Sequence, residues 1–309
     1  MKKPKSFVWI TSTYFAEGLP YTIIRSISSV FLRDKNVSLE AIGLTSLYGI
    51  PWILKFLWGP FIDNFSTKRN FLISIQFILS LVFLTSALFS PFSAGVFVIG
   101  IIFFLGSLLA ATQDIAIDGY YMEALEKKEQ EKYIGLRILA YRIGMIFGTS
   151  ILITIGTAYS WFLAFLTASI VLFLLSLFHF IYLPKVEQPK ENIKELFKKF
   201  AKFKFFIIIA IIITITYFLN YLTESSFYKT IPYLSKLNFS HIIGILLILS
   251  LLSVFFLKTY IKNKIMNAKD KSYSDSFLSF IDRDKIGIAI LFIISIRVGE
   301  FLLHAMVPV

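Results

Sequence analysis

The sequence predicts an all-α polytopic membrane protein, and three observations carry this prediction. Hydrophobic residues fill 57% of the 309 positions and charged residues 16%, whereas a soluble domain carries about 25% charged residues. The mean hydropathy is +0.75. The apolar residues gather in nine runs, each close to the roughly 20 residues that a helix needs to cross a bilayer core. This composition excludes a disordered chain and a nucleic-acid module, and the absence of cysteine excludes a disulfide scaffold.

The nine expected spans cover most of the chain. The first follows a basic start that resembles a signal peptide, but its apolar run is longer and contains Glu17 and Arg25, so we expect it to stay in the protein. Pro20, Pro51 and Pro60 should bend the first two spans. The spans are 7–32, 41–62, 71–90, 94–122, 134–158, 160–183, 205–223, 240–257 and 286–307.

The distribution of Lys and Arg predicts a cytoplasmic N-terminus. With that orientation, fifteen basic residues in the first 204 positions lie on the inner side, against only Arg33 and Lys35 in the outer loops. The net charge of +12 therefore reflects topology and attraction to anionic lipid rather than a nucleic-acid partner. The basic segment 193–200 repeats apolar residues at helical spacing, which favours an interfacial helix over a solvated linker.

Four ionisable residues of the expected spans fall at one depth, about 10–17 Å above the inner boundary. They come from four different helices and are of opposite sign: Glu17, Lys55, Asp114 and Arg142. Asp118 shares a helix face with Asp114, and folding the chain back near residue 129 is expected to place Arg142 opposite this pair.

Two interpretations of this layer compete. The first is an ion-pair network that holds the helices together, and Asp118 fits this interpretation best. The second is a polar cavity in which a carboxylate accepts a proton and Lys or Arg binds an anionic substrate. We favour the cavity for the other four residues. The nearby tyrosines either stack on a sugar ring or simply pack, and they are Tyr14, Tyr21, Tyr121 and Tyr141.

The remaining charged residues of the spans are given lesser roles. Arg25 is expected to snorkel at the outer mouth, and Arg137 and Glu123 to be solvated or paired at the inner surface. His179, His241 and His304 are scattered, so no metal site and no cofactor is predicted.

The segment Gly59-Pro60-Phe61-Ile62-Asp63 followed by Lys68-Arg69 resembles the gate motif of the major facilitator superfamily. It departs from that motif at Asn64, where a basic residue is usual, and at Ser66, where glycine is usual. The resemblance implies gating roles for Gly59, Asp63, Lys68 and Arg69.

Four further motifs resemble the AmpG-type muropeptide permeases, which are relatives of the acetyl-CoA transporters. They are Phe15-Ala16-Glu17-Gly18-Leu19-Pro20, Pro51-Trp52-Ile53-Leu54-Lys55-Phe56-Leu57-Trp58-Gly59-Pro60, Ala111-Thr112-Gln113-Asp114-Ile115-Ala116-Ile117-Asp118-Gly119 and Tyr141-Arg142-Ile143-Gly144. The charged layer, found by counting depth, is built from the same residues.

The resemblance implies a proton-coupled importer of anhydromuropeptides in the bacterial inner membrane, or a transporter of acetyl-CoA or another small solute. Combined with the layer, it assigns proton coupling to Asp114 ahead of Glu17, with Asp118 beside them. Substrate binding is assigned to Arg142, Lys55, Tyr121, Tyr141, Arg297 and Glu300.

The family's fold has twelve helices in two six-helix bundles, whereas nine spans are expected here. We therefore expect a six-helix bundle at 1–184, an amphipathic cytoplasmic loop with a two-helix insertion at 185–285, and the first helix of a truncated second bundle at 286–309. The alternative makes 205–223 the seventh helix, with Asn220 and Glu224 as its polar groups.

Other functions remain open beside the transporter. Alternating access needs both bundles, so the chain is expected to be a fragment, a decayed copy or a half that pairs with a separate C-terminal half. A membrane-embedded enzyme would need a His, Cys, Ser or carboxylate constellation at an interface, and the scattered histidines and lack of cysteine argue against it.

Overall fold

The computed structural model describes residues 5–55, 58–59, 62 and 67–186, and the regular elements of these ranges are all helices. The first expected span is one continuous helical rod. Pro20 lies near its middle, where the missing backbone donor disturbs the α-helical ladder, and the rod widens into a π-helical turn three residues later. The rod consists of α1 (Ser6–Thr22), the turn η1 (Ile23–Ile27) and α2 (Ser28–Asp34).

The second expected span is broken into short pieces. Its first helix is capped by the Ser38 side chain, which accepts a hydrogen bond from the Ala41 amide, and Pro51 lies in the first turn of the last piece, where its missing donor is tolerated. Pro60 lies outside the described residues. The pieces are α3 (Leu39–Gly43), the 3-10 turn η2 (Leu44–Gly49) and α4 (Ile50–Leu54).

The next four expected spans are helices that are long and apolar enough to cross a membrane. Thr67 and Ser160 cap two of them by accepting backbone hydrogen bonds. They are α6 (Lys68–Phe89), α7 (Gly95–Ala124), the continuous run of α8 (Lys127–Ile146), η4 (Phe147–Leu152) and α9 (Ile153–Ala158), and α10 (Trp161–Tyr182). The all-α prediction is thus confirmed, and the expected spans 205–223, 240–257 and 286–307, with segment 193–200, lie outside the described residues.

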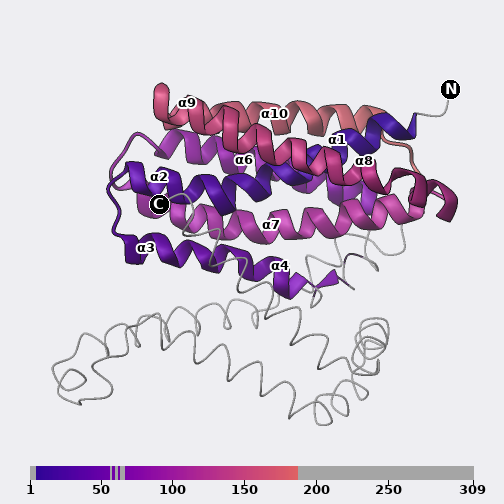
Figure 1. Cartoon of the computed structure of the whole chain (residues 1–309), viewed down its shortest axis with the longest axis horizontal. Coiled ribbons are helices and arrows are strands. Elements are labelled where there is room, and N and C mark those ends of the chain that lie inside the picture. The colour runs from indigo at the N-terminus through magenta and orange to yellow at the C-terminus, as the bar shows by residue number, and fades with distance from the viewer. Residues whose placement is uncertain (1–4, 56–57, 60–61, 63–66, 187–309) are drawn as a thin grey trace, which may run out of the picture. The chain divides into compact units, whose positions relative to one another are not determined.

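The helices pack side by side, with α6 against both α7 and α10, and α1 against α8 (Figure 1). The α1–α8 contact is backbone to backbone. A Cβ added at Gly18 would lie 2.3 Å from the Tyr141 carbonyl oxygen, and one added at Gly144 would lie 2.4 Å from that of Phe15. Glycine at both positions therefore allows these two helices to approach closely.

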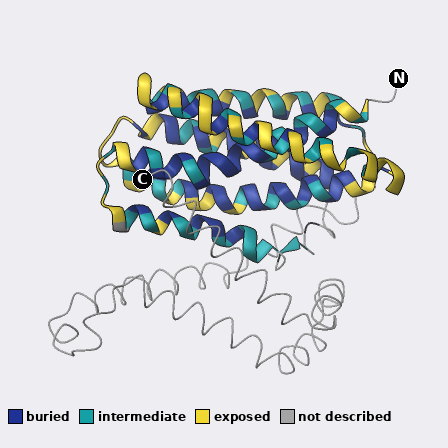
Figure 2. Ribbon diagram, in the orientation of Figure 1, coloured by how far each residue is buried: buried dark blue, intermediate teal, exposed yellow. Residues whose placement is uncertain are grey.

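Burial follows the interior of this bundle, and the outward faces are exposed (Figure 2). Aromatic rings fill the interior where α2, α6, α7 and α10 meet. Phe103 contacts Phe83 and Phe165 edge to face, and Phe165 contacts Phe31 in the same way. These rings are buried, while the exposed side chains of the long helices are largely Leu, Ile and Phe, as lipid-facing surfaces require.

One end of the bundle is basic, and we call it the basic end; it carries Lys5, Lys68, Arg69, Lys127 and Lys128. The Arg69 guanidinium donates to the carbonyl oxygens of Phe180 and Leu183, at 2.5 and 2.8 Å, where α10 ends. A cation satisfies the unpaired carbonyls of a helix C-terminus. This contact fastens α6 to α10 at the basic end.

Arg25 does not snorkel as expected. Its residue is 1% exposed, and its guanidinium donates to the carbonyl oxygens of Thr45 and Ser46, at 3.3 and 3.2 Å. These carbonyls belong to the 3-10 turn η2, whose backbone bonding differs from that of an α-helix. Arg25 is therefore retained inside the bundle because a neighbouring irregular helix supplies it with acceptors.

Candidate functional site

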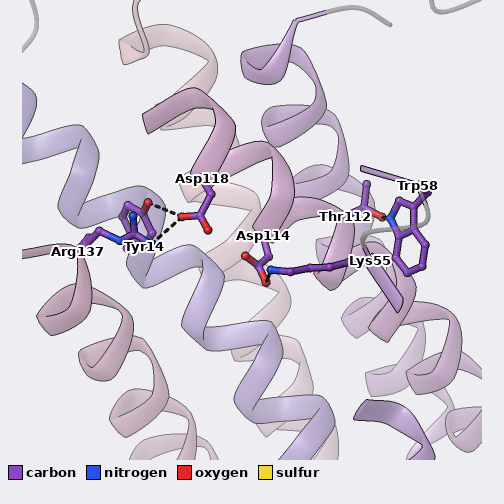
Figure 3. A network of polar contacts seen from close by, with 7 residues as sticks. All are labelled: Tyr14, Lys55, Trp58, Thr112, Asp114, Asp118 and Arg137. Carbon is purple, nitrogen blue, oxygen red and sulfur yellow. Dashed lines mark hydrogen bonds and ion pairs between the residues drawn. The ribbon is translucent and has the colours of Figure 1, made fainter. Parts of the chain in front are cut away.

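The first part of the site is an ion pair between Lys55, at the end of α4, and Asp114, in α7. The Lys55 ammonium nitrogen lies 2.8 Å from Asp114 Oδ2 (Figure 3). The Asp114 side chain is 11% exposed and that of Lys55 is 35% exposed, so the carboxylate is the deeper partner. Near it, the indole nitrogen of Trp58 donates to Thr112 Oγ1 at 3.1 Å. Two polar contacts thus attach this part of the second span to α7.

The second part lies one helical turn along α7, at Asp118. Its Oδ1 accepts a hydrogen bond from the Tyr14 hydroxyl at 2.8 Å and lies 3.0 Å from an Arg137 nitrogen (Figure 3). The same guanidinium lies over the rings of Tyr14 and Tyr121, at 4.9 and 5.2 Å from their centroids. The Tyr121 hydroxyl in turn donates to the Gln130 carbonyl oxygen. This cluster joins α1, α7 and α8.

Glu17 lies on α1, three residues after Tyr14 and hence near it on the helix surface. The charges of Lys55, Asp114, Asp118 and Arg137 all act on its carboxyl group. Its Oε2 atom is buried and accepts no hydrogen bond from any residue that the structure describes. Among the residues that the structure describes, Glu17 thus belongs to neither ion pair, although the charges of both act on it.

Arg142 does not lie opposite the two aspartates, and in this respect the expected arrangement is wrong. Its side chain is exposed and its Nη1 atom contacts Met145 Sδ at 3.9 Å, while Arg137 occupies the place beside Asp118. A residue five positions further along an α-helix is rotated by roughly 140°. The number of residues from the helix end gives the depth of Arg142 in the membrane, but not the direction in which its side chain points around the helix.

Arg137 is thus the main residue of the site that sequence reasoning undervalued, although pairing was one of the two environments expected for it. Glu123, expected in the same way, is also paired: its Oε1 lies 3.2 Å from the Lys68 ammonium nitrogen. Both pairs join neighbouring helices near the basic end. Helical periodicity could have distinguished the two arginines. Arg137 lies on the same side of α8 as the buried positions Ala140 and Gly144, whereas Arg142 lies on the opposite side.

Aromatic rings of α1, α4 and α8 pack together on the side of α4 that carries Lys55. Tyr21 packs edge to face on Trp52 with ring centroids 5.1 Å apart, and its centroid lies 6.0 Å from that of Tyr141. Trp52 precedes Lys55 by three residues, so both lie on the same side of α4. Tyr141, an expected substrate-binding residue, therefore lies in an aromatic run that also includes Trp52, a residue to which the sequence analysis assigned no role.

The expected gating residues are only partly described. Lys68 and Arg69 are buried and bound within the bundle, to Glu123 and to the end of α10. At Gly59 an added Cβ would meet no atom within 4 Å. Asp63 lies outside the described residues, as do the expected substrate-binding residues Arg297 and Glu300.

His179 is buried where α10 meets α6 and α1. Its ring nitrogens lie 2.8 Å from Gln76 Oε1 and 2.9 Å from Ser12 Oγ. These partners satisfy the imidazole and account for a histidine inside the bundle. In the described part of the chain, no group of three His, Cys, Asp or Glu side chains is arranged to hold a metal ion.

The family model of the Major Facilitator Superfamily matches residues 10–294. The chain belongs to this superfamily. It is accordingly a multi-pass membrane protein of a transporter superfamily. Membership of the superfamily accounts for the resemblance of residues 59–69 to its gate motif.

Several curated bacterial proteins are similar to this superfamily member. An uncharacterized protein of Haemophilus influenzae is 29% identical over 188 residues, which cover 58% of this chain and 44% of the relative. The anhydromuropeptide permease of Escherichia coli K12 is 26% identical over 137 residues, covering 43% and 28%. A Rickettsia prowazekii protein with AmpG transporter in its name is 28% identical over 153 residues, covering 46% and 35%. The chain thus spans less than half the length of these relatives.

Among solved structures, a peptide transporter POT crystallised with sulfate is similar in fold. The likeness has a TM-score of 0.55 at 16% sequence identity, and covers 82% of this chain and 52% of that transporter. At this identity it supports the superfamily fold alone.

Proposed function

We propose that the protein acts in the proton-coupled import of anhydromuropeptides across the bacterial inner membrane. The observation that carries the proposal is the charged cluster of Figure 3, in which two ion pairs and the Tyr14 hydroxyl join α1, α4, α7 and α8. Glu17 of α1 is near enough for the charges of both pairs to act on its carboxyl group. Charges at this depth in a membrane protein are costly and usually mark a substrate or proton route. The candidate proton-coupling residues are Asp114, Glu17 and Asp118.

The chemistry of the substrate suits the groups beside the cluster. An anhydromuropeptide contains sugar rings and peptide carboxylates. Lys55 and the exposed Arg142 supply cations for carboxylates, and Arg142 has the planar fork that binds them in two places. Tyr141 and Tyr121 supply rings for a sugar, and Arg297 and Glu300 complete the proposed set. The name of the Escherichia coli relative, anhydromuropeptide permease, supports the same substrate.

The proposed gate is the segment that follows the second span. Gly59, Asp63, Lys68 and Arg69 would control opening at the basic end, which we propose faces the cytoplasm. The contacts of Lys68 with Glu123 and of Arg69 with the end of α10 keep two of these residues in place. Asp63 would then provide the charge that changes partner when the transporter alternates.

A second candidate is a half-transporter that acts with a separate C-terminal half, because the chain spans less than half the length of its curated relatives. A third is transport of acetyl-CoA or another small solute. One assay distinguishes these two candidates from import of anhydromuropeptides by this chain.

The assay uses the full chain in sealed lipid vesicles and radiolabelled anhydromuropeptide. We expect accumulation that depends on an inward proton gradient and collapses with a protonophore. Accumulation only after adding a second bundle would support the half-transporter. Uptake of radiolabelled acetyl-CoA by the same vesicles, without uptake of the muropeptide, would contradict the proposed substrate.

A further inference from the structure

Glu17 differs from the other two carboxyl groups of the cluster, because no residue that the structure describes forms a hydrogen bond or ion pair with it. Its Oε2 atom is buried and lacks a hydrogen-bond donor among the described residues. By contrast, Asp114 holds the Lys55 ammonium at 2.8 Å, and Asp118 holds both Arg137 and the Tyr14 hydroxyl. Both cations that act on Glu17 are therefore engaged with aspartates.

A charge count follows from these contacts. Among the described residues of the cluster, three carboxyl groups face two cations, so three ionised carboxylates would leave one uncompensated negative charge. The Glu17 charge also acts on the hydroxyls of Tyr14 and Tyr141, which are uncharged near neutral pH. Arg142, the neighbour of Tyr141, is exposed. A buried charge without a partner is avoided by taking up a proton.

We propose that Glu17 holds this proton and is the residue that carries it through the transport cycle. The transport role of this proton rests on the proposed function. Glu17 thereby replaces Asp114 as the leading candidate for the proton-coupling residue. Asp114 is less suited because its charge is already compensated by Lys55 at hydrogen-bonding distance.

Release of the proton changes the contacts of Lys55. The O–H bond of the Glu17 carboxyl group breaks, the proton passes to water, and the carboxylate keeps the electron pair. Lys55 is one-third exposed on a flexible stem, and its charge already acts on Glu17. The Lys55 ammonium group can therefore share its hydrogen bonds between the carboxylates of Asp114 and Glu17. Because Lys55 ends α4, the proton on Glu17 controls how firmly this segment is held to α7.

The test is infrared spectroscopy of the full chain in lipid vesicles at neutral pH, without substrate. A protonated buried carboxyl group gives a C=O stretching band that ionised carboxylates lack. We expect this band to shift when all glutamates carry a 13C carboxyl carbon and to stay in place when all aspartates do. A band that moves with the aspartate label, or no band, overturns the proposal. Labelling leaves the fold unchanged, so the result does not depend on a variant that folds poorly.

Two variants with matched controls locate the proton. Glu17→Gln should abolish the band, whereas Glu129→Gln, at an exposed glutamate of α8, should leave it. Lys55→Gln leaves three carboxyl groups with one cation and should about double the band, whereas Lys132→Gln at an exposed lysine should not. A band that persists in Glu17→Gln overturns the proposal, as does an unchanged band in Lys55→Gln.

The infrared spectrum tests the protonation of Glu17, and the uptake assay tests the proposed function, so either proposal can be contradicted without the other. A Glu17 band in a protein that does not accumulate anhydromuropeptide supports the protonation and contradicts the proposed function. Proton-driven accumulation by a protein without the band supports the proposed function and overturns the assignment to Glu17.

Discussion

Arg137 and Arg142 lie five residues apart on α8 and have different surroundings. Arg137 is fastened to Asp118 and to two tyrosine rings, whereas Arg142 is exposed and contacts Met145. A partly buried ion pair with these extra contacts contributes to stability, while an exposed cation is free to bind a ligand. The two arginines therefore allow a structural role and a substrate role to be separated.

We expect Arg137→Ala to lower the free energy of unfolding by about 1–2 kcal/mol, between the values typical of exposed and buried pairs. Arg142→Ala should leave stability unchanged and reduce uptake of acidic muropeptides at least about tenfold. Thermal unfolding in detergent and vesicle uptake measure the two effects. Equal destabilisation by both substitutions would contradict the orientation of α8.

At the scale of elements, the irregular helical turns are neighbours. The π-helical turn η1 packs against the 3-10 turn η2 and the π-helical turn η4, so three helices depart from α geometry in one region. Arg25 connects two of them through the Thr45 and Ser46 carbonyls. Such departures often occur at functional positions in helices.

Arg25→Met should loosen η2, because two carbonyls lose a charged donor inside the bundle. Hydrogen bonds to charged groups contribute about 1.5–3 kcal/mol, so amide exchange across 44–49 should accelerate roughly tenfold or more. Hydrogen exchange read by mass spectrometry measures this, with Arg33→Met, at an exposed arginine, as the control. Equal exchange in the two variants would show that Arg25 does not hold η2.

The packing of α1 on α8 gives a second test at this scale. Gly144→Ala places a Cβ 2.4 Å from the Phe15 carbonyl oxygen, and overpacking of this kind costs about 1–3 kcal/mol. Gly135→Ala, on the same helix, meets no atom within 4 Å and should be neutral or slightly stabilising. Melting temperatures of the two variants should differ clearly, and equal values would argue against close α1–α8 contact.

At the scale of the whole molecule, charge and hydropathy act together. The apolar exteriors of the long helices suit a bilayer, and the excess of Lys and Arg at one end is typical of a cytoplasmic side. Because the chain contains no cysteine, its orientation can be measured with single introduced thiols.

We expect Ser93→Cys, between α6 and α7, to react with a membrane-impermeant maleimide in spheroplasts. Glu126→Cys, between α7 and α8 at the basic end, should react only after permeabilisation. Both positions are exposed in the structure, so accessibility does not favour either. The reverse labelling pattern would show that the N-terminus is outside.

Hydropathy along the chain determined the helical class and the approximate limits of α6, α7, α10 and the run from α8 to α9, because the bilayer requires apolar helices of known length. The short motifs around Glu17, Lys55 and Asp114 determined the family resemblance. The tertiary structure alone decided which charges meet. Helical periodicity relates residues within one helix, but the pairing of Asp118 with Arg137, the burial of Arg25 against η2 and the isolation of Glu17 depend on how separate helices are rotated and shifted against each other.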